Sequence, residues 1–211
     1  MRDFRYLLAV DPSLTCSGWA LFSVPTGDIR CVGKIKGEPP SVPMSQRLST
    51  FHIRIDELFS GFGLGGGDAV VCEAPTTMRD PHNAIKVEQV RGIFESAARS
   101  CGALVPGRIN PRSVQYEVMG LTGKQLKRSD VKGAAVQTVR YLYATNLAKI
   151  GFSVEEAALS RQQDIVDALL IGRLALLRLQ AAAQASVSVE SLFESPASKS
   201  RQSWRVRSIA V

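Results

Sequence analysis

Four acidic residues stand out in this 211-residue sequence because of the apolar segments beside them. Asp11 and Glu73 each end a short apolar run, and Asp164 and Asp167 lie three residues apart at the start of a long one. A carboxylate at the end of a buried strand is costly unless a cation or hydrogen bonds compensate its charge. Residues three apart on a helix share one face. The pattern therefore predicts an acidic site that binds divalent metal ions.

Each acid also has an ordinary structural explanation when it is taken alone. Asp11 is suited to an Asx-turn with the residues that follow it, and Glu73 to a solvated strand end. Asp164 is suited to the first turn of a helix, where the helix dipole favours negative charge. Asp167 is harder to explain in this way, because apolar residues surround it. Together the four acids favour the metal site.

Composition narrows the class of protein and the type of metal. Hydrophobic residues make up 45% of the chain and charged residues 21%, as in ordinary globular proteins. No apolar run has the length of a membrane span, and the N-terminus lacks a signal-peptide pattern, so we expect a cytoplasmic protein. The four cysteines are scattered and there are only two histidines. Oxygen ligands remain, and these suit Mg²⁺, with Mn²⁺ able to substitute.

The net charge of +7 is concentrated in the middle of the chain, where residues 79–150 carry 12 basic and 5 acidic side chains. A localised basic excess is typical of phosphate binding, and a solvated helical surface is the alternative. The candidates for contacts with a DNA backbone are Lys86, Arg91, Lys124, Lys127 and Arg128. With the acidic site, this charge predicts a nucleic-acid substrate and phosphodiester cleavage. Lys132 is a further candidate, for stabilising negative charge that develops on the phosphate.

Hydrophobic periodicity and turn signals predict an α/β fold. We expect strands over 4–11, 17–24, 29–35, 69–73 and 103–109, the last weakened or placed at an edge by Pro106 and Gly107. We expect helices over 44–60, 84–101, 111–120, 130–146 and 162–184, and a short helix opened by a capping box at 153–156. Ile85 is expected to face inward, and Ser129 to cap the helix that follows it. The order predicts a mixed five-stranded sheet, with three antiparallel strands and then parallel ones, flanked by helices. Residues 1–184 would form one domain, followed by a flexible, basic, Ser-rich tail over 185–211.

Several motifs occur in a fixed order along the chain. They are Leu8-Ala9-Val10-Asp11-Pro12-Ser13 with Thr15 and Gly18, Val70-Val71-Cys72-Glu73, Ala84-x-Lys86-x-x-Gln89-x-Arg91-Gly92, Pro111-x-x-Val114 with Gly120, Lys132, and Asp164-x-x-Asp167-Ala168. The set resembles the RuvC-type Holliday junction resolvases of the RNase H-like superfamily, over about residues 5–180. The resemblance implies a homodimeric endonuclease that nicks four-way DNA junctions.

The resemblance also implies roles for the acidic residues and for one lysine. Two Mg²⁺ ions would occupy each active site. Asp11 would bridge them, Glu73 would bind beside it, and Asp164 and Asp167 would complete the other side of the site. Lys132 matches a lysine that the family places near the scissile phosphate. Two metals can activate water and stabilise the leaving oxygen of a phosphodiester.

The chain departs from the family pattern in four places, one of which is its longer basic tail. Ala74-Pro75-Thr76-Thr77 follows Glu73 where many bacterial members carry glutamine and then an aromatic wedge. Gln115 replaces a basic residue, and 121–128 looks like an insertion. These features resemble a phage or otherwise divergent member with relaxed junction specificity. Two other classes remain open: an actin-like ATPase or sugar-kinase-type phosphate-binding domain, suggested by Asp11-x-x-x-Thr15-x-x-Gly18, and a junction-DNA-binding protein without catalysis.

Overall fold

A five-stranded mixed sheet forms the centre of the molecule in the computed structural model, which describes residues 3–75, 80–122 and 126–193. The strands are β1 Tyr6–Asp11, β2 Cys16–Ser23, β3 Ile29–Lys36, β4 Asp68–Glu73 and β5 Arg108–Ile109. The longer helices are α1 Met44–Phe62, α2 Pro81–Ser100, α4 Arg128–Lys149 and α6 Gln163–Ala185. Shorter helical segments are α3 Pro111–Ser113, η1 Val114–Val118, α5 Glu156–Ser160 and η2 Glu190–Leu192.

The spatial strand order is β3-β2-β1-β4-β5. The pairs β1–β2 and β2–β3 are antiparallel, whereas β1–β4 and β4–β5 are parallel. This is the mixed sheet that the sequence predicts. Because β1 and β4 are parallel neighbours, their last residues, Asp11 and Glu73, lie at the same edge of the sheet.

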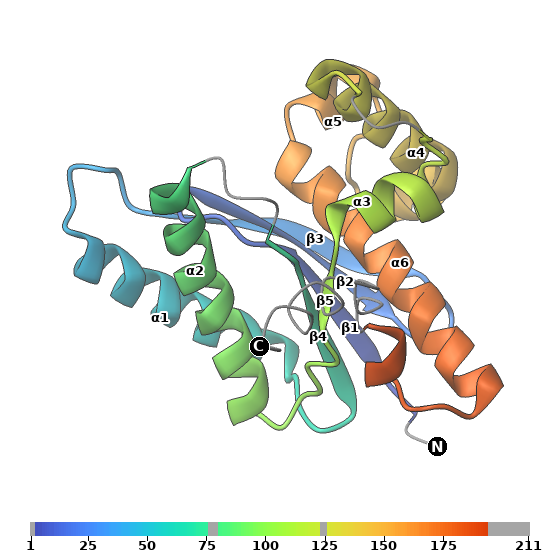
Figure 1. Cartoon of the computed structure of the whole chain (residues 1–211), viewed down its shortest axis with the longest axis horizontal. Helices are drawn as coiled ribbons and strands as arrows, with labels where there is room; N and C mark the ends of the chain where they lie inside the picture. Colours follow the sequence, from blue (N-terminus) through green and yellow to red (C-terminus); the bar gives the residue numbers. More distant parts are fainter. Residues whose placement is uncertain (1–2, 76–79, 123–125, 194–211) are drawn as a thin grey trace, which may run out of the picture.

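Helices cover both faces of the sheet, as Figure 1 shows, with α1 and α2 on one side and α4 and α6 on the other. Successive residues of β1 belong to different cores: Leu7 packs with the α6 side and Leu8 with the α1 and α2 side. A strand buried on both faces reads as a continuous apolar run, which is why β1 and β4 are recognisable in the sequence. Asp11 and Glu73, the last residues of β1 and β4, belong to neither core.

Three local expectations need adjustment. The strand expected over 103–109 lies at the edge of the sheet and is reduced to Arg108–Ile109, with an isolated bridge at Leu104. Pro106, which has no N–H to donate, and Gly107, with a φ of 151°, weaken it as expected. The helix expected over 111–120 changes to a π-helix at Val114. Ser129 does not cap α4: the cap position is Lys127, and the Ser129 hydroxyl lies 3.0 Å from an Asp130 carboxylate oxygen.

The described start of the C-terminal segment is folded against the domain, contrary to the expectation of a flexible tail from residue 185. After α6 the chain turns at Ser186, whose φ is 54°, and the short helix η2 follows. Phe193 is only 4% exposed and its Cβ lies 2.7 Å from where a Cβ on Gly107 would stand. The basic residues of the predicted tail, beyond 193, lie outside the described residues.

Two surface features bear on the predictions from sequence. Ile85 is 55% exposed rather than inward-facing, because it lies in the first turns of α2, before that helix reaches the core. Among the described helices, none is both long and apolar enough to cross a membrane.

Candidate active site

The structure brings the four predicted acids to one edge of the sheet. Asp11 and Glu73 are the last residues of β1 and β4, and Asp164 and Asp167 lie in the first two turns of α6. Asp11 feels the negative charge of each of the other three, which shows that the four groups share one site. Each side chain is half-buried.

Gly18 allows the start of α6 to approach the sheet this closely. Gly18 on β2 is the register partner of Asp11. A Cβ at this position would stand 1.9 Å from the carbonyl oxygen of Asp164, closer than any side chain tolerates. The glycine seven residues after Asp11 is therefore needed for the acids of β1 and α6 to meet.

Burial and mutual repulsion raise the pKa values of the clustered carboxyls. Burial raises the pKa of Asp11 well above its usual range, and the charges of Glu73, Asp167 and Asp164 add to the effect. Burial, followed by the charge of Asp167, raises the pKa of Glu73 to about 7. Burial also raises the pKa of Asp167 to about 6. The site thus holds negative charge that the protein does not fully compensate.

The carboxylates of this cluster differ in their partners. Within the described part of the chain, no hydrogen bond or ion pair reaches the carboxylates of Asp11, Glu73 or Asp167. Asp164 instead pairs with Lys34 of β3, at 3.2 Å between Nζ and Oδ2. Sequence reasoning missed Lys34; the available signal was a lysine inside a predicted strand that the hairpin places opposite Gly18.

The donor set fits hard divalent cations such as Mg²⁺. It consists of carboxylates, the ligands that such ions prefer, and their mutual repulsion would be relieved by a positive charge. In the described residues, no three acidic, histidine or cysteine side chains already converge closely enough to hold an ion. Binding would therefore require side-chain rotations, and no hydrogen bond within the described residues holds the carboxylates of Asp11, Glu73 and Asp167 in place.

Two predicted basic residues lie beside the acids. Lys132 and Arg128, near the start of α4, lower the pKa of Asp167, so their charges are close to it. Both line a pocket of about 230 Å³ together with Glu73, Asp167 and Gln115. This hollow is large enough to admit part of a substrate next to the carboxylates. Arg128 was predicted as a phosphate contact and Lys132 as a catalytic residue, and the pocket places both beside the acids.

The other predicted DNA contacts fall in different places. Lys127 is exposed at the N-cap of α4. Lys86 is half-buried in the first turns of α2. Lys124 lies outside the described residues, as do Thr76 and Thr77 of the segment that follows Glu73.

Arg91 requires a correction, because the structure places it inside the protein. The residue is 1% exposed, and its Nε donates a hydrogen bond of 2.6 Å to the main-chain oxygen of Glu73. Its Nη1 pairs with Glu88. A guanidinium enclosed in this way cannot reach a DNA phosphate, so the prediction that Arg91 contacts DNA is wrong. A basic residue at helical spacing gives no sign from sequence alone that the helix turns it inward.

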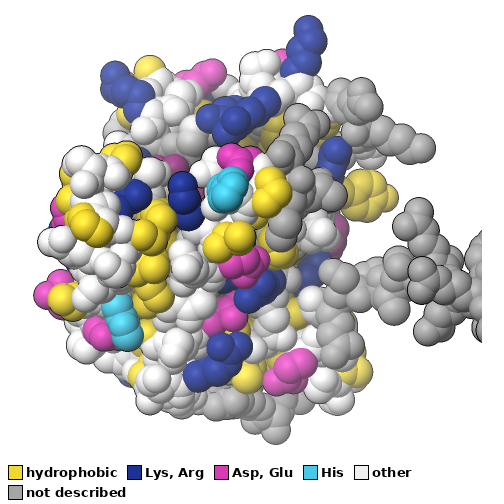
Figure 2. Space-filling model, turned by 60° about the vertical axis from the view of Figure 1, so that its left-hand side comes forward, with side chains coloured by type: hydrophobic (Ala, Val, Ile, Leu, Met, Phe, Trp, Pro, Cys, Tyr) yellow, Lys and Arg dark blue, Asp and Glu magenta, His cyan; other side chains and the backbone are white. Residues whose placement is uncertain are grey.

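Part of the basic excess in the middle of the chain is likewise neutralised within the protein. Arg99 and Arg108 both pair with Glu95, and Arg140 pairs with Glu156. On the face drawn in Figure 2, basic side chains are scattered among acidic and hydrophobic ones rather than gathered into one patch. The charge available for phosphate binding is therefore smaller than the sequence count suggests, and it includes the exposed start of α4.

The chain has the fold of solved RuvC structures, as the sequence predicts. Thermus thermophilus RuvC in complex with a Holliday junction substrate superposes with a TM-score of 0.61 at 20% identity, covering 86% of this chain and 97% of that one. A second Thermus thermophilus RuvC structure superposes with a TM-score of 0.60 at 22% identity, covering 85% of this chain and 96% of that one. The fowlpox virus Holliday junction resolvase gives 0.50 at 10% identity, covering 82% and 99%.

Sequence comparison points in the same direction. The chain is 28% identical over 119 residues to the crossover junction endodeoxyribonuclease RuvC of Erythrobacter litoralis, which covers 56% of this chain and 70% of that protein. No family model matches the sequence. The resemblance to RuvC-type Holliday junction resolvases that the motifs predict is thus confirmed.

Proposed function

We propose that this protein is an endonuclease that resolves four-way or other branched DNA junctions by metal-dependent phosphodiester hydrolysis. The observation that carries the proposal is the group of four carboxylates at one edge of a RuvC-type sheet. Three of them have no hydrogen-bond or ion-pair partner among the described residues, and burial raises their pKa values despite nearby basic charges. Such a group costs folding free energy, so it is best explained by chemistry that needs it. The resolvases with similar folds supply the substrate class.

Asp11, Glu73, Asp164 and Asp167 would hold two Mg²⁺ ions, which supply activation of the attacking water and stabilisation of the leaving oxygen when bound. The strand ends fix Asp11 and Glu73, and α6 presents the other two acids across from them. Lys34 forms an ion pair with Asp164. Carboxylate side chains without hydrogen bonds are free to turn toward the ions.

Basic residues beside the acids would receive the DNA backbone. Lys132 and Arg128 line the pocket next to Glu73 and Asp167, so a phosphate entering this pocket meets positive charge. Lys132 would stabilise the charge that develops on the phosphate during cleavage. Arg128 and the exposed Lys127 would position the strand rather than read its bases.

A homodimer follows from the geometry of the reaction. Resolving a junction needs two cuts on strands of like polarity, which requires two active sites related by a two-fold axis. We therefore propose that two copies act together on one junction. The cut at each site would be made by one protomer's own acids.

The proposal is tested by incubating the protein with labelled four-way junction, duplex and flap DNA, in Mg²⁺ or in EDTA. We expect paired symmetric cuts in the junction, weaker cutting of the flap, and none in EDTA. Equal cutting of duplex and junction would refute junction selectivity, and cleavage in EDTA would refute the metal-dependent mechanism. Hydrolysis of ATP without DNA cleavage would favour the phosphate-binding ATPase class instead.

A further inference from the structure

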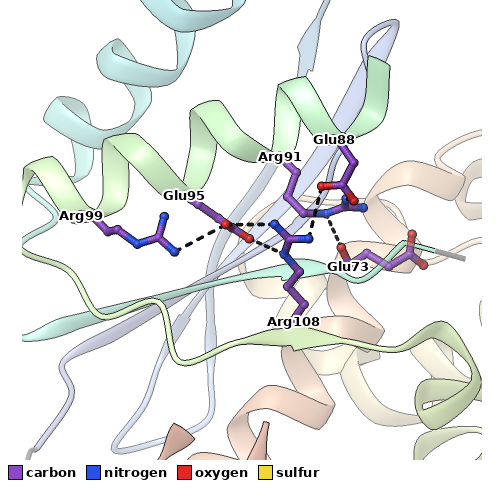
Figure 3. Close-up of polar contacts among 6 residues, drawn as sticks. All are labelled: Glu73, Glu88, Arg91, Glu95, Arg99 and Arg108. Atoms are coloured by element: carbon purple, nitrogen blue, oxygen red, sulfur yellow. Dashed lines mark hydrogen bonds and ion pairs between the residues drawn. The ribbon is translucent and has the colours of Figure 1, made fainter. Parts of the chain in front are cut away.

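Arg91 is buried behind the carboxylate site, where a charge is expensive unless every part of it is paired. It is the largest of the fully buried side chains and lies on α2, facing the end of β4. Its Nε donates to the main-chain oxygen of Glu73 at 2.6 Å, and its Nη1 pairs with Glu88. Figure 3 shows the Glu73 carboxylate extending away from this contact. Arg91 therefore holds the backbone of the acid and leaves its side chain free.

The pairing continues from Arg91 along the helix, as Figure 3 shows. Arg108 of β5 donates to Glu88 at 3.2 Å and to Glu95 at 2.7 and 3.2 Å. Arg99 approaches the same Glu95 at 3.6 Å. This network ties α2 to the last two strands of the sheet. Only Arg91 among its basic members bonds directly to Glu73.

Among the described residues, few other contacts fix the end of β4. Glu73 pairs with Ile109 of the two-residue strand β5, and the N–H of Ala74 donates to the Ile109 carbonyl at 2.7 Å. A strand end beside so short a neighbour has little to hold it in place. An ordered arginine that bonds the last carbonyl fixes the position from which the Glu73 side chain departs.

We infer that Arg91 is a positioning residue for the acidic site, which fixes the Glu73 backbone from inside the protein so that Glu73 and Asp11 present their oxygens to a shared cation. This inference rests on the proposed metal-dependent function. It assigns Arg91 no contact with DNA. Mutation of residues that orient metal ligands typically lowers metal affinity by about 10- to 100-fold.

The test measures metal binding without DNA, as the rise in melting temperature with added Mg²⁺, alongside cleavage. Arg91→Lys keeps a positive charge but loses the fixed Nε bond, and we expect it to need about tenfold more Mg²⁺ for half of its thermal shift and for half-maximal cleavage. Affinity for junction DNA in EDTA should stay at the wild-type value. Arg91→Gln should show a larger rise in the Mg²⁺ requirement.

The matched control is Arg5→Lys, because Arg5 ties down the other end of the same strand through Asp68. We expect it to lower the melting temperature and leave the Mg²⁺ requirement unchanged. An equal rise in that requirement for Arg5→Lys would show that any loosening of β4 suffices, and would overturn the inference. A loss of junction affinity in EDTA with unchanged Mg²⁺ requirement would make Arg91 a DNA contact instead.

A third variant keeps the inference testable if neither Arg91 variant folds. Glu88→Gln keeps the guanidinium and its bond to Glu73 but weakens the partner that orients it. We expect a smaller rise in the Mg²⁺ requirement, about twofold to threefold. If both Glu88→Gln and Arg91→Lys needed no more Mg²⁺ than the wild type, the inference would be overturned. If the Arg91 variants do not fold, the same result for Glu88→Gln alone would overturn it. Absence of any Mg²⁺ effect on the wild-type protein would instead overturn the proposed function.

Discussion

The two ends of β4 each carry a carboxylate and each meet an arginine, yet the two are built differently. At the first residue, Asp68 is fully buried and accepts hydrogen bonds from Arg5 Nε and Nη2, from the Tyr6 N–H and from the Gly65 N–H, at 2.7 to 3.1 Å. At the last residue, Arg91 bonds the Glu73 backbone and leaves the carboxylate without a donor among the described residues.

The contrast separates a structural carboxylate from one that is kept for chemistry. Asp68 has its charge and lone pairs satisfied by the protein, which joins β1, β4 and the loop before β4. Burial and the charge of Asp167 raise the pKa of Glu73 to about 7, because the nearby charge of Arg91 offsets them only in part. The number of hydrogen-bond donors to each carboxylate distinguishes Asp68 from Glu73 better than burial alone does.

The largest expected effect comes from removing an acid at the chemical end. Asp11→Asn should reduce Mg²⁺-dependent junction cleavage by about 10³-fold, because an amide is neutral and a poorer ligand for a divalent ion. The measurement is the single-turnover cleavage rate at saturating Mg²⁺. Asp68→Asn is the control, and should cleave at nearly the wild-type rate per folded molecule while melting earlier. Equal rates for wild type and Asp11→Asn would contradict the site.

Stability should respond in the opposite sense at the two ends. In EDTA near pH 8, Glu73→Gln should stabilise the protein by about 2 kcal/mol, because it removes a charge that burial and Asp167 disfavour. Asp68→Asn should destabilise it by a similar amount, because buried hydrogen bonds to a charge are lost. Urea unfolding measures both. Destabilisation by Glu73→Gln would show that an unseen partner holds this carboxylate.

The pH dependence of stability provides a sharper version of the same test. The pKa values of Glu73 and Asp167, about 7 and about 6, exceed the ordinary values of 4.5 and 3.8. At a pH between the ordinary and the raised pKa of each group, the folded chain therefore binds more protons than the unfolded chain. The contribution of these groups is therefore present at low pH and is lost as the pH rises through about 6 to 7. Urea unfolding in EDTA from pH 5 to 8 should show this decline, and Glu73→Gln should reduce it. Mg²⁺ at pH 7.5 should restore stability in the wild type only.

The elements that position the site were predictable because their signals are local. Apolar runs buried on both faces marked β1 and β4, and an acid at the end of each marked the edge of the sheet. Gly18 was quoted in a motif, but the reason for it, the approach of Asp164, exists only in three dimensions. Roles that follow from a local pattern could be stated from sequence, whereas roles that follow from close packing could not.

Charged residues show the limit of the sequence most clearly. Arg91 is predicted as a DNA contact because its position in the sequence does not reveal that it is buried. Lys34 lies within a predicted strand, and nothing in the sequence indicates its ion pair with Asp164. The ion-pair partner of a charged side chain is set by the tertiary structure, so these ion pairs could not be predicted from the sequence.

The smallest expected effect concerns surface charges that neither end of β4 uses. Lys127→Ala and Arg128→Ala should each weaken junction binding in EDTA by about threefold to tenfold at low salt, because each removes one predicted phosphate contact. Each should also reduce by about one the slope of log affinity against log salt concentration. Arg140→Ala is the matched control: it lies on the same helix, α4, about 18 Å further along and paired with Glu156, so its slope should equal that of the wild type. An unchanged slope in Lys127→Ala and Arg128→Ala would mean that DNA approaches the acids from another side, with the start of α4 left in solvent.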